Sequence, residues 1–302
     1  MRTDPQPRIQ ADAMDPCGAS LRLALPKGRM HDGLVRLLAD AGIEVLRESR
    51  GYRASLSWEG CETKLLKPQT IVEMLHAGTR DAGFAGADWV GELGADLVEV
   101  FDTGLDTVRV VAAAPLELLE DGKLPSRPLI IASEYVGLTR AWIADRGLDA
   151  RVIRSYGATE VFPPEDADAI VDNTATGATL RANGLQICEE LMQSSTRLYA
   201  SQAAWADPAR RKTIEDLVIL LQAVLEARSR VLVEVNVAPA ALDALVELLP
   251  CMREPTISPL HSQSGYAVKA AVPRRNLAAL LPRIREVGGT DILVSEPSQI
   301  LP

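Results

Sequence analysis

The sequence predicts an α/β fold, in which two α/β lobes are followed by a small ferredoxin-like module. Strand and helix patterns alternate twice between residues 21 and 199, which is typical of parallel sheets covered by helices. An amphipathic helix is predicted from Pro208 to the region of Arg228. Residues 231–302 then follow the order βαββαβ, which is typical of a ferredoxin-like module.

The first predicted element is a strand at residues 21–25, which Pro26 ends. The basic turn Lys27-Gly28-Arg29 follows, and apolar residues then recur at helical spacing. Two cations beside a glycine suit a pyrophosphate or triphosphate, because Arg offers a planar fork of donors and Lys a point charge. A solvated loop is the alternative interpretation of this turn.

Short apolar runs and two helix starts predict the rest of the first lobe. Lys67-Pro68 opens one helix, which Gly78 closes, and Asp88 opens another. The predicted strands are 54–58, 62–66, 81–86, 97–101 and 108–113. Small residues in the strand before Asp88 would let a nucleotide lie against the backbone.

In the second lobe, strands are predicted at 129–132, 152–153 and 169–171, with a helix through 141–143. Residues 172–180 follow the last strand and read Asp-Asn-Thr-Ala-Thr-Gly-Ala-Thr-Leu, a polar turn that leads into a helix. This turn is the most informative stretch of the chain.

We predict that this turn binds phosphate. A turn at a helix N-terminus leaves backbone N–H groups unpaired, and Thr174, Thr176 and Thr179 add hydroxyl donors. Gly177 lets the backbone approach a ligand closely. Asp172 would repel a phosphate that it touched, so it needs ribose hydroxyls or Mg²⁺ as a partner. The alternative is that these residues only cap a helix.

The composition argues against several functions. The chain has 302 residues, enough for two or three domains, and 32 Lys and Arg against 41 Asp and Glu give a net charge of −9. Non-specific binding to nucleic acid is therefore not expected, and a polyanionic substrate needs a local basic cluster. Neither G-x-x-x-x-G-K-[ST] nor G-x-G-x-x-G occurs, which disfavours P-loop hydrolysis and dinucleotide binding.

The 4 cysteines and 3 histidines are widely spaced and include no C-x-x-C pair, so neither a disulfide framework nor a zinc site is expected. An apolar run of about eighteen residues, as a membrane span requires, is also missing. Residues 1–20 carry prolines and acids without the apolar core of a secretory signal. We predict a disordered extension at 1–20 and a cytoplasmic protein.

Three segments of the second lobe resemble the signature of the ATP phosphoribosyltransferases, the first enzymes of histidine biosynthesis. They are residues 157–160, 167–172 and 176–185. The turn Lys27-Gly28-Arg29 and the segment 81–88 resemble further motifs of this family, and the motifs at 248–250 and 255–260 resemble those of its long form. The resemblance spans nearly all of residues 21–298.

The resemblance implies a two-lobed catalytic part, similar to periplasmic binding proteins, and an ACT-like regulatory domain at the C-terminus. The implied boundaries are 21–106 for lobe I, with the helix 200–228 returning to it, 107–199 for lobe II and 229–302 for the ACT-like domain.

The implied reaction condenses ATP with phosphoribosyl diphosphate to N1-(5-phosphoribosyl)-ATP and pyrophosphate, with Mg²⁺ held mainly by the substrates. L-Histidine would inhibit by binding the C-terminal domain, and homo-oligomers from dimer to hexamer are implied. From the residues alone, a structural dimerisation module is an equally good interpretation of that domain.

The resemblance also implies roles for individual residues. The implied substrate-binding residues are Lys27, Gly28, Arg29, Arg50, Lys67, Asp88, Glu160, Asp168, Asp172, Thr174, Ala175, Thr176, Gly177, Ala178 and Thr179. Arg29, Asp168 and Asp172 are the implied catalytic residues, and no general base is assigned. Thr256 and Leu260 are implied at the histidine site. Alternatively, Glu160 is only a helix-start acid, and Asp168 only a solubilising charge at a strand edge.

Three positions depart from the usual pattern of the family. Thr70 stands where an acid is common, and Asn173 and Thr174 stand where aliphatic residues are common. The entrance to the turn is therefore more polar than usual, which we expect to tune affinity.

The sequence leaves three alternative functions. A noncatalytic small-ligand sensor of the periplasmic type needs a secretion signal or a DNA-binding helix pair, and neither is visible in the sequence. A different phosphoribosyltransferase would lack the C-terminal module. A noncatalytic regulatory subunit is disfavoured by the intact elements at 27–29 and 176–179.

Overall fold

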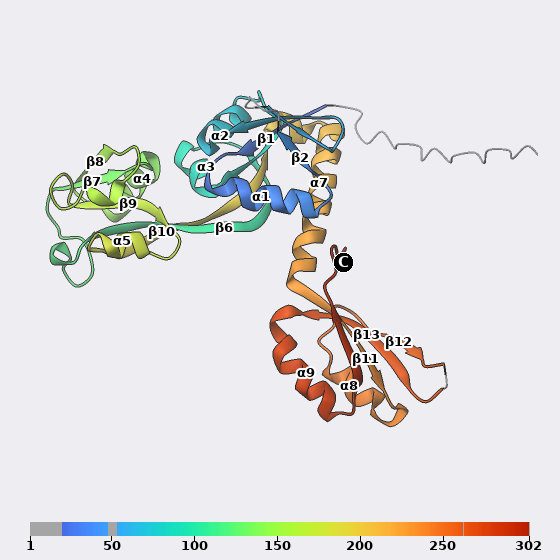
Figure 1. Cartoon of the computed structure of the whole chain (residues 1–302). Helices are drawn as coiled ribbons and strands as arrows, with labels where there is room; N and C mark the ends of the chain where they lie inside the picture. The colour runs from blue at the N-terminus through green and yellow to red at the C-terminus, as the bar shows by residue number, and fades with distance from the viewer. Residues whose placement is uncertain (1–19, 48–52, 262, 302) are drawn as a thin grey trace, which may run out of the picture.

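The computed structural model describes residues 20–47, 53–261 and 263–301 (Figure 1). Arg50 and the extension predicted at the N-terminus, apart from residue 20, lie outside the described residues. The chain forms two lobes, a long helix and a C-terminal domain, and the predicted α/β fold class is confirmed: a two-lobed, periplasmic-binding-protein-like part followed by a ferredoxin-like domain.

The strands of the two lobes are β1 (Leu21–Pro26), β2 (Val45–Arg47), β3 (Arg53–Leu56), β4 (Cys61–Leu66), β5 (Ala82–Gly86), β6 (Val98–Pro115), β7 (Leu129–Ser133), β8 (Ala150–Arg154), β9 (Ala169–Thr174) and β10 (Leu185–Ala200). The helices that accompany them are α1 (Arg29–Asp40), α2 (Pro68–His76), α3 (Ala87–Leu93), α4 (Val136–Arg146), α5 (Ala178–Ala182), α6 (Gln202–Ala206) and α7 (Pro208–Ser229).

One 10-stranded sheet runs through both lobes in the order β2-β3-β4-β1-β5-β10-β6-β9-β7-β8. In lobe I, β1 is parallel to β4 and β5, and in lobe II, β7 is parallel to β8 and β9. The long strands β6 and β10 pair antiparallel and link the two lobes (Figure 1). Because the carboxyl ends of parallel strands meet at one edge of a sheet, the turns after β1 and β4, and those after β7 and β9, come together.

The linking strands differ from the sequence-based prediction. Residues 97–101 and 108–113 were expected to be two strands, but all of them except Leu97 belong to the single strand β6, and most of β10 was not predicted. Polar contacts between the strands explain the difference, since Ser195 Oγ donates to Asp102 at 2.6 Å and Thr196 Oγ1 donates to Asp106 at 2.9 Å. These polar residues interrupt the apolar pattern on which strand prediction relies.

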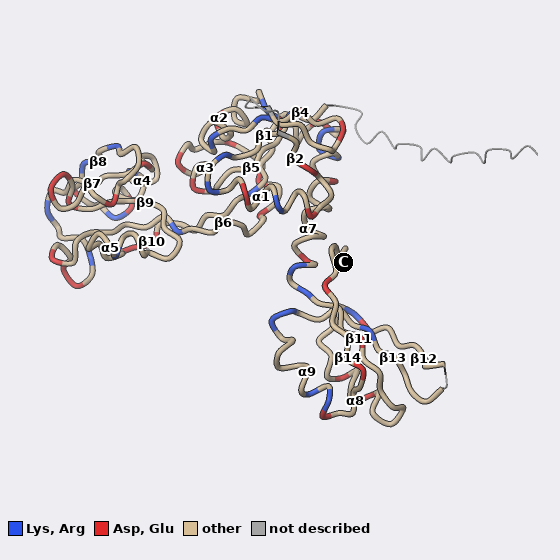
Figure 2. The backbone as a smooth tube through the Cα atoms, in the orientation of Figure 1, with Lys and Arg blue, Asp and Glu red and all other residues tan. Residues whose placement is uncertain are grey.

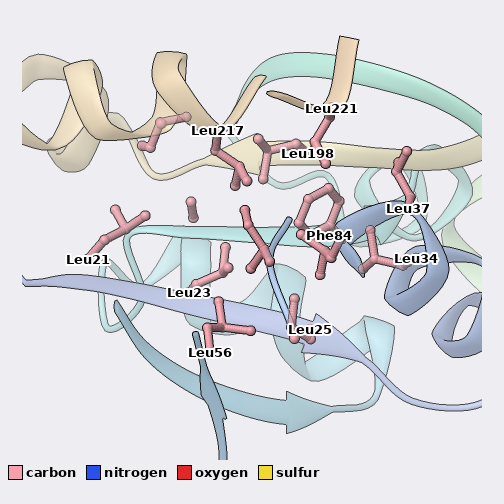
Figure 3. Close-up of a cluster of buried hydrophobic side chains, with 14 of the residues drawn as sticks. Leu21, Leu23, Leu25, Leu34, Leu37, Leu56, Phe84, Leu198, Leu217 and Leu221 are labelled. Atoms are coloured by element: carbon pink, nitrogen blue, oxygen red, sulfur yellow. The ribbon is translucent and has the colours of Figure 1, made fainter. Parts of the chain in front are cut away.

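The core of lobe I lies between the sheet and helices α1 and α7 (Figure 3). Leucines 21, 23 and 25 of β1 and Phe84 of β5 contact Leu34 and Leu37 of α1 and Leu217 and Leu221 of α7. The buried carboxylate of Asp81 forms ion pairs with Arg22 at 2.7 Å and with Arg210 of α7 at 3.5 Å. Helix α7 is therefore held to lobe I by apolar packing and by charge.

The C-terminal domain contains β11 (Arg230–Val237), α8 (Leu242–Leu248), β12 (Thr256–Pro259), β13 (Tyr266–Pro273), α9 (Leu277–Glu286) and β14 (Thr290–Ser295). Its sheet has the order β12-β13-β11-β14. Alternate residues of β11, from Val231 to Val237, are buried against Leu245 of α8 and Ile284 of α9. The other face of the sheet is not covered by these helices (Figure 1).

Candidate active site

A cavity of about 410 Å³ lies at the carboxyl ends of β7 and β9 in lobe II. Its lining residues come from three segments of the chain: Glu134, Gly157, Glu160, Asp172, Asn173, Thr174, Ala175, Thr176, Ala178, Thr179 and Leu180. Most of the turn predicted to bind phosphate is among them. Sequence reasoning missed Glu134, although an acid directly after a buried strand was a usable signal.

Asp172 is the most strongly perturbed acid of the cavity. Burial raises its pKa to about 6, and the nearby charges of Glu134 and Glu160 act in the same direction. Hydrogen bonds to Asp172 from the backbone N–H of Asn173 and the hydroxyl of Thr159 oppose this shift. A ligand that offers hydroxyl donors would stabilise the ionised form of Asp172.

The turn after β9, which we call the phosphate loop (residues 174–179), is shaped by its own threonines. The N–H of Gly177 donates to Thr174 Oγ1 at 2.9 Å, and that of Ala178 donates to Thr176 Oγ1 at 3.3 Å. Gly177 has φ +74°, a conformation that favours glycine. Thr174 is buried and holds the turn, whereas Thr176 and Thr179 are exposed at the cavity.

Asp168 does not lie beside Asp172, which corrects our expectation. It directly precedes β9, so it stands at the opposite end of this strand, roughly 13 Å away at 3.3 Å per residue. There it accepts hydrogen bonds from the N–H of Ile130 at 2.8 Å and from Arg127 at 2.8 Å. Burial would raise the pKa of Asp168, but these contacts together hold it below its ordinary value. Its surroundings are those of a structural ion pair.

The basic residues predicted in lobe I share one edge of its sheet. β1 and β4 are parallel and end in register, with Pro26 opposite Leu66. Lys27 and Lys67 follow these two strands directly, and the N–H of Lys27 donates to the carbonyl of Leu66 at 2.8 Å. Arg29 is exposed and begins α1. Acidic and basic residues are otherwise interspersed along both lobes (Figure 2), so this cluster is local.

Asp88 lies apart from the cavity, between the lobes. Its side chain is buried and accepts hydrogen bonds from Ser194 Oγ at 2.8 Å and from the Tyr135 hydroxyl at 2.7 Å. The Tyr135 oxygen in turn accepts a hydrogen bond from Asn173 Nδ2 at 2.9 Å. Sequence reasoning did not single out Tyr135, because an aromatic residue after a strand is usually interpreted as part of the hydrophobic core.

In the C-terminal domain, a second cavity of about 460 Å³ lies on the sheet face opposite α8 and α9. Thr256 lines it, together with the ion pair of Glu234 and Lys269 and with Asp291. Leu260 is not among the lining residues, and its N–H donates to the carbonyl of Gly265.

Within residues 20–47, 53–261 and 263–301, no group of three or more His, Cys, Asp or Glu residues gathers in a way that could hold a metal ion. None of the helices described there is long and apolar enough to cross a membrane.

Comparison with known proteins decides the family. A model of ATP phosphoribosyltransferase matches residues 67–223, and a model of the C-terminal domain of the same family matches residues 227–298. The ATP phosphoribosyltransferase of Chlorobaculum parvum is 36% identical over 286 residues, which cover 93% of this chain and 97% of that protein. That of Pelotomaculum thermopropionicum is 36% identical over 291 residues, covering 93% and 99%.

The chain belongs to the ATP phosphoribosyltransferase family. A solved structure of the ATP phosphoribosyl transferase (HisG:HisZ) complex from Thermotoga maritima is similar, with a TM-score of 0.61 and 27% identity over 68% of this chain and 98% of that one. The predicted long form and the predicted transferase of the first step of histidine biosynthesis are confirmed, and the noncatalytic alternatives are not favoured.

Proposed function

We propose that the cavity at the end of β9 binds the ribose 5-phosphate part of phosphoribosyl diphosphate and that the reaction with ATP occurs at its rim. The observation that carries this proposal is the pairing of the half-buried Asp172 with a loop of threonines in one cavity. Thr176 and Thr179 would bind the 5′-phosphate, and Asp172 would accept hydrogen bonds from the ribose hydroxyls.

The reaction breaks the bond between C1 of the ribose and the pyrophosphate oxygen and forms a bond between C1 and N1 of ATP. No covalent nucleophile is needed, because the leaving group is already activated. The transition state resembles an oxocarbenium ion, so the protein acts by positioning and by charge. The negative charge of Asp172 beside the ribose would stabilise the positive charge that develops there.

Lys27, Arg29 and Lys67 supply the positive charge in this proposal. They gather at the carboxyl edge of the lobe I sheet, where ligands of such sheets bind. Their charge suits the triphosphate of ATP or the departing pyrophosphate. The proposed division of the catalytic part is lobe I at 21–106 with the helix 200–228, and lobe II at 107–199, although β6 continues across residue 106 as one strand.

Magnesium fits this cavity as a companion of the substrates. Mg²⁺ would be held mainly by the substrates, because the carboxylates of Glu134, Glu160 and Asp172 line the cavity without forming a group that could hold a metal ion by themselves. They would also repel a bare pyrophosphate, so a cation bound to the substrate favours its entry. When bound, Mg²⁺ would neutralise the charge of the leaving pyrophosphate.

We further propose that residues 229–302 form an ACT-like regulatory domain at which L-histidine inhibits. The cavity lined by Thr256 contains Lys269, Glu234 and Asp291, whose charges suit the carboxylate and ammonium groups of an amino acid. A homo-oligomer, from dimer to hexamer, and a cytoplasmic location belong to the same proposal, since the substrates are intracellular metabolites.

The test is pyrophosphate release by the full-length chain with ATP, phosphoribosyl diphosphate and Mg²⁺, with and without L-histidine. Turnover that requires both substrates and is suppressed by histidine supports both assignments. Turnover that is indifferent to histidine removes the regulatory role. Turnover with an unchanged KM for phosphoribosyl diphosphate in Thr179→Val removes the cavity assignment.

A further inference from the structure

Asp88 anchors a hydrogen-bonded network between the lobes, which we call the interlobe network (Asp88, Ser194, Tyr135 and Asn173). Asp88 is 4% exposed, and both of its carboxylate oxygens accept hydrogen bonds. Its own N–H donates to Ser194 Oγ at 3.1 Å. The carboxylate folds back over Gly86, where an added Cβ would clash with Asp88 Oδ1. The lobe I end of the network is therefore fixed.

Tyr135 carries the network from lobe I into lobe II. It is 1% exposed, and its ring lies 4.9 Å from that of Trp89 in α3. Its N–H donates to Ser133 Oγ, which donates in turn to the carbonyl of Val171 in β9. The pKa of Tyr135 is raised above its ordinary value by burial and by the charge of Asp88. The hydroxyl therefore stays protonated and donates to Asp88, and its oxygen accepts from Asn173.

Asn173 lies where β9 is supported by a strand on one side only. Pairing of β9 with β7 ends at Val171, whereas pairing with β6 continues through residues 172–174. On the side that β7 leaves, Asn173 Nδ2 donates to the Tyr135 hydroxyl. The backbone N–H of Asn173 donates to Asp172 Oδ1 at 2.7 Å. Hydrogen bonds thus run without a gap from α3 of lobe I to the acid of the cavity.

We infer that Tyr135 and Asn173 are positioning residues, which hold the end of β9 against lobe I so that Asp172 and the phosphate loop are preformed for phosphoribosyl diphosphate. This inference rests on the proposed function of the cavity. Neither side chain is assigned a contact with the reacting atoms. Asp88, which the sequence placed among the substrate-binding residues, serves as the anchor of this arrangement.

Loss of the interlobe network should have a different kinetic effect from loss of ordinary core packing. Without the bond between Tyr135 and Asn173, the end of β9 adopts other conformations, and only a fraction of molecules presents a competent cavity. The apparent affinity for the ligand is multiplied by that fraction, so it falls as the fraction falls. The effect should therefore appear in KM for phosphoribosyl diphosphate, whereas a loss of core packing lowers stability and has no preference between substrates.

The experiment compares steady-state kinetics of the full-length chain with those of Tyr135→Phe, Asn173→Leu and the double variant. We expect each single variant to raise KM for phosphoribosyl diphosphate about tenfold, which corresponds to about 1.4 kcal/mol. In each single variant, KM for ATP should change less than about twofold relative to the parent, and kcat less than about threefold. The double variant should equal Tyr135→Phe, because this substitution already removes the hydrogen bond from Asn173.

Tyr266→Phe in the C-terminal domain is the matched control for loss of a tyrosine hydroxyl, and both KM values should stay as in the parent. Additive effects of the two substitutions, or equal rises in both KM values, would overturn the inference. Asn173→Leu keeps the test decisive if Tyr135→Phe fails to fold.

Thr179→Val separates the two proposals. If Thr179→Val raises KM for phosphoribosyl diphosphate and the network variants do not, only the positioning role fails. If none of these variants raises this KM, the cavity assignment fails too.

Discussion

The two ends of β9 carry the same kind of side chain in opposite situations. Asp168 precedes the strand and Asp172 lies four residues later, near its carboxyl end. The pKa of Asp168 is held low by Ile130 N–H and Arg127, against the effect of burial. The pKa of Asp172 is raised to about 6 by burial and by neighbouring acids. Arg127 provides a positive charge for Asp168, whereas the charged neighbours of Asp172 are the acids Glu134 and Glu160.

This difference separates a structural acid from a functional one more reliably than position in a motif does. A satisfied carboxylate contributes to folding, and its removal leaves buried donors without a partner. A carboxylate that faces other acids in a cavity is a net cost to the fold and is best explained by a ligand. The following predictions test whether the two acids of β9 differ in this way, beginning with the largest expected effect.

Asp172→Asn should lower kcat/KM for phosphoribosyl diphosphate about a hundredfold. Hydrogen bonds to a charged group contribute about 1.5–3 kcal/mol each, and two ribose hydroxyls would lose this charged acceptor. Steady-state pyrophosphate release measures the change, with the exposed Asp166→Asn as a matched control of unchanged rate. An Asp172→Asn enzyme with more than about half of the parent kcat/KM would contradict the role of Asp172, because a lost charged hydrogen bond costs more.

The ratio of parent to Asp172→Asn kcat/KM should fall as the pH drops through about 6. The folded pKa of Asp172 is raised to about 6, so the carboxylate becomes protonated below this value and loses the charge that the ribose hydroxyls and the transition state need. Because both enzymes act on the same substrates, the ratio removes the effect of substrate ionisation on kcat/KM. A ratio that stays constant between about pH 5 and about pH 8, which lie on either side of this pKa, would show that the charge of Asp172 has no part in catalysis.

Much of this site was predictable from local sequence. Threonines and glycine after a short apolar strand predicted the phosphate loop, and its residues line one cavity. The error over Asp168 arose because sequence spacing does not show which end of a strand faces the ligand, or that Arg127 approaches from another loop. Tyr135 was missed because its partners, Asp88 and Asn173, lie 47 and 38 residues away in the sequence.

Asp168→Ala should leave the N–H of Ile130 without its acceptor and lower the free energy of unfolding by about 1–3 kcal/mol at neutral pH. The folded pKa of Asp168 lies below the ordinary 3.8, so its stabilising contribution is present above 3.8 and is lost as the pH falls through the folded value. Urea denaturation at neutral and acidic pH measures this difference. A deficit that persists unchanged at acidic pH would assign the effect to the hydrogen bond of Ile130 alone, without a contribution of charge.

Asp172→Asn should have the opposite effect on stability, and a smaller one. Because the folded pKa of Asp172 is raised from 3.8 to about 6, the folded state holds the proton more tightly in that window, and stability falls as the pH rises through it. Above about pH 6 the ionised side chain is a net cost, which asparagine removes while its carbonyl still accepts from Asn173 N–H. At pH near 8, thermal denaturation should show a Tm higher by about 2–4 °C for each 1 kcal/mol gained. A lower Tm would mean that the hydrogen bonds from Asn173 and Thr159 outweigh burial, and Asp172 would then belong with Asp168 among the structural acids.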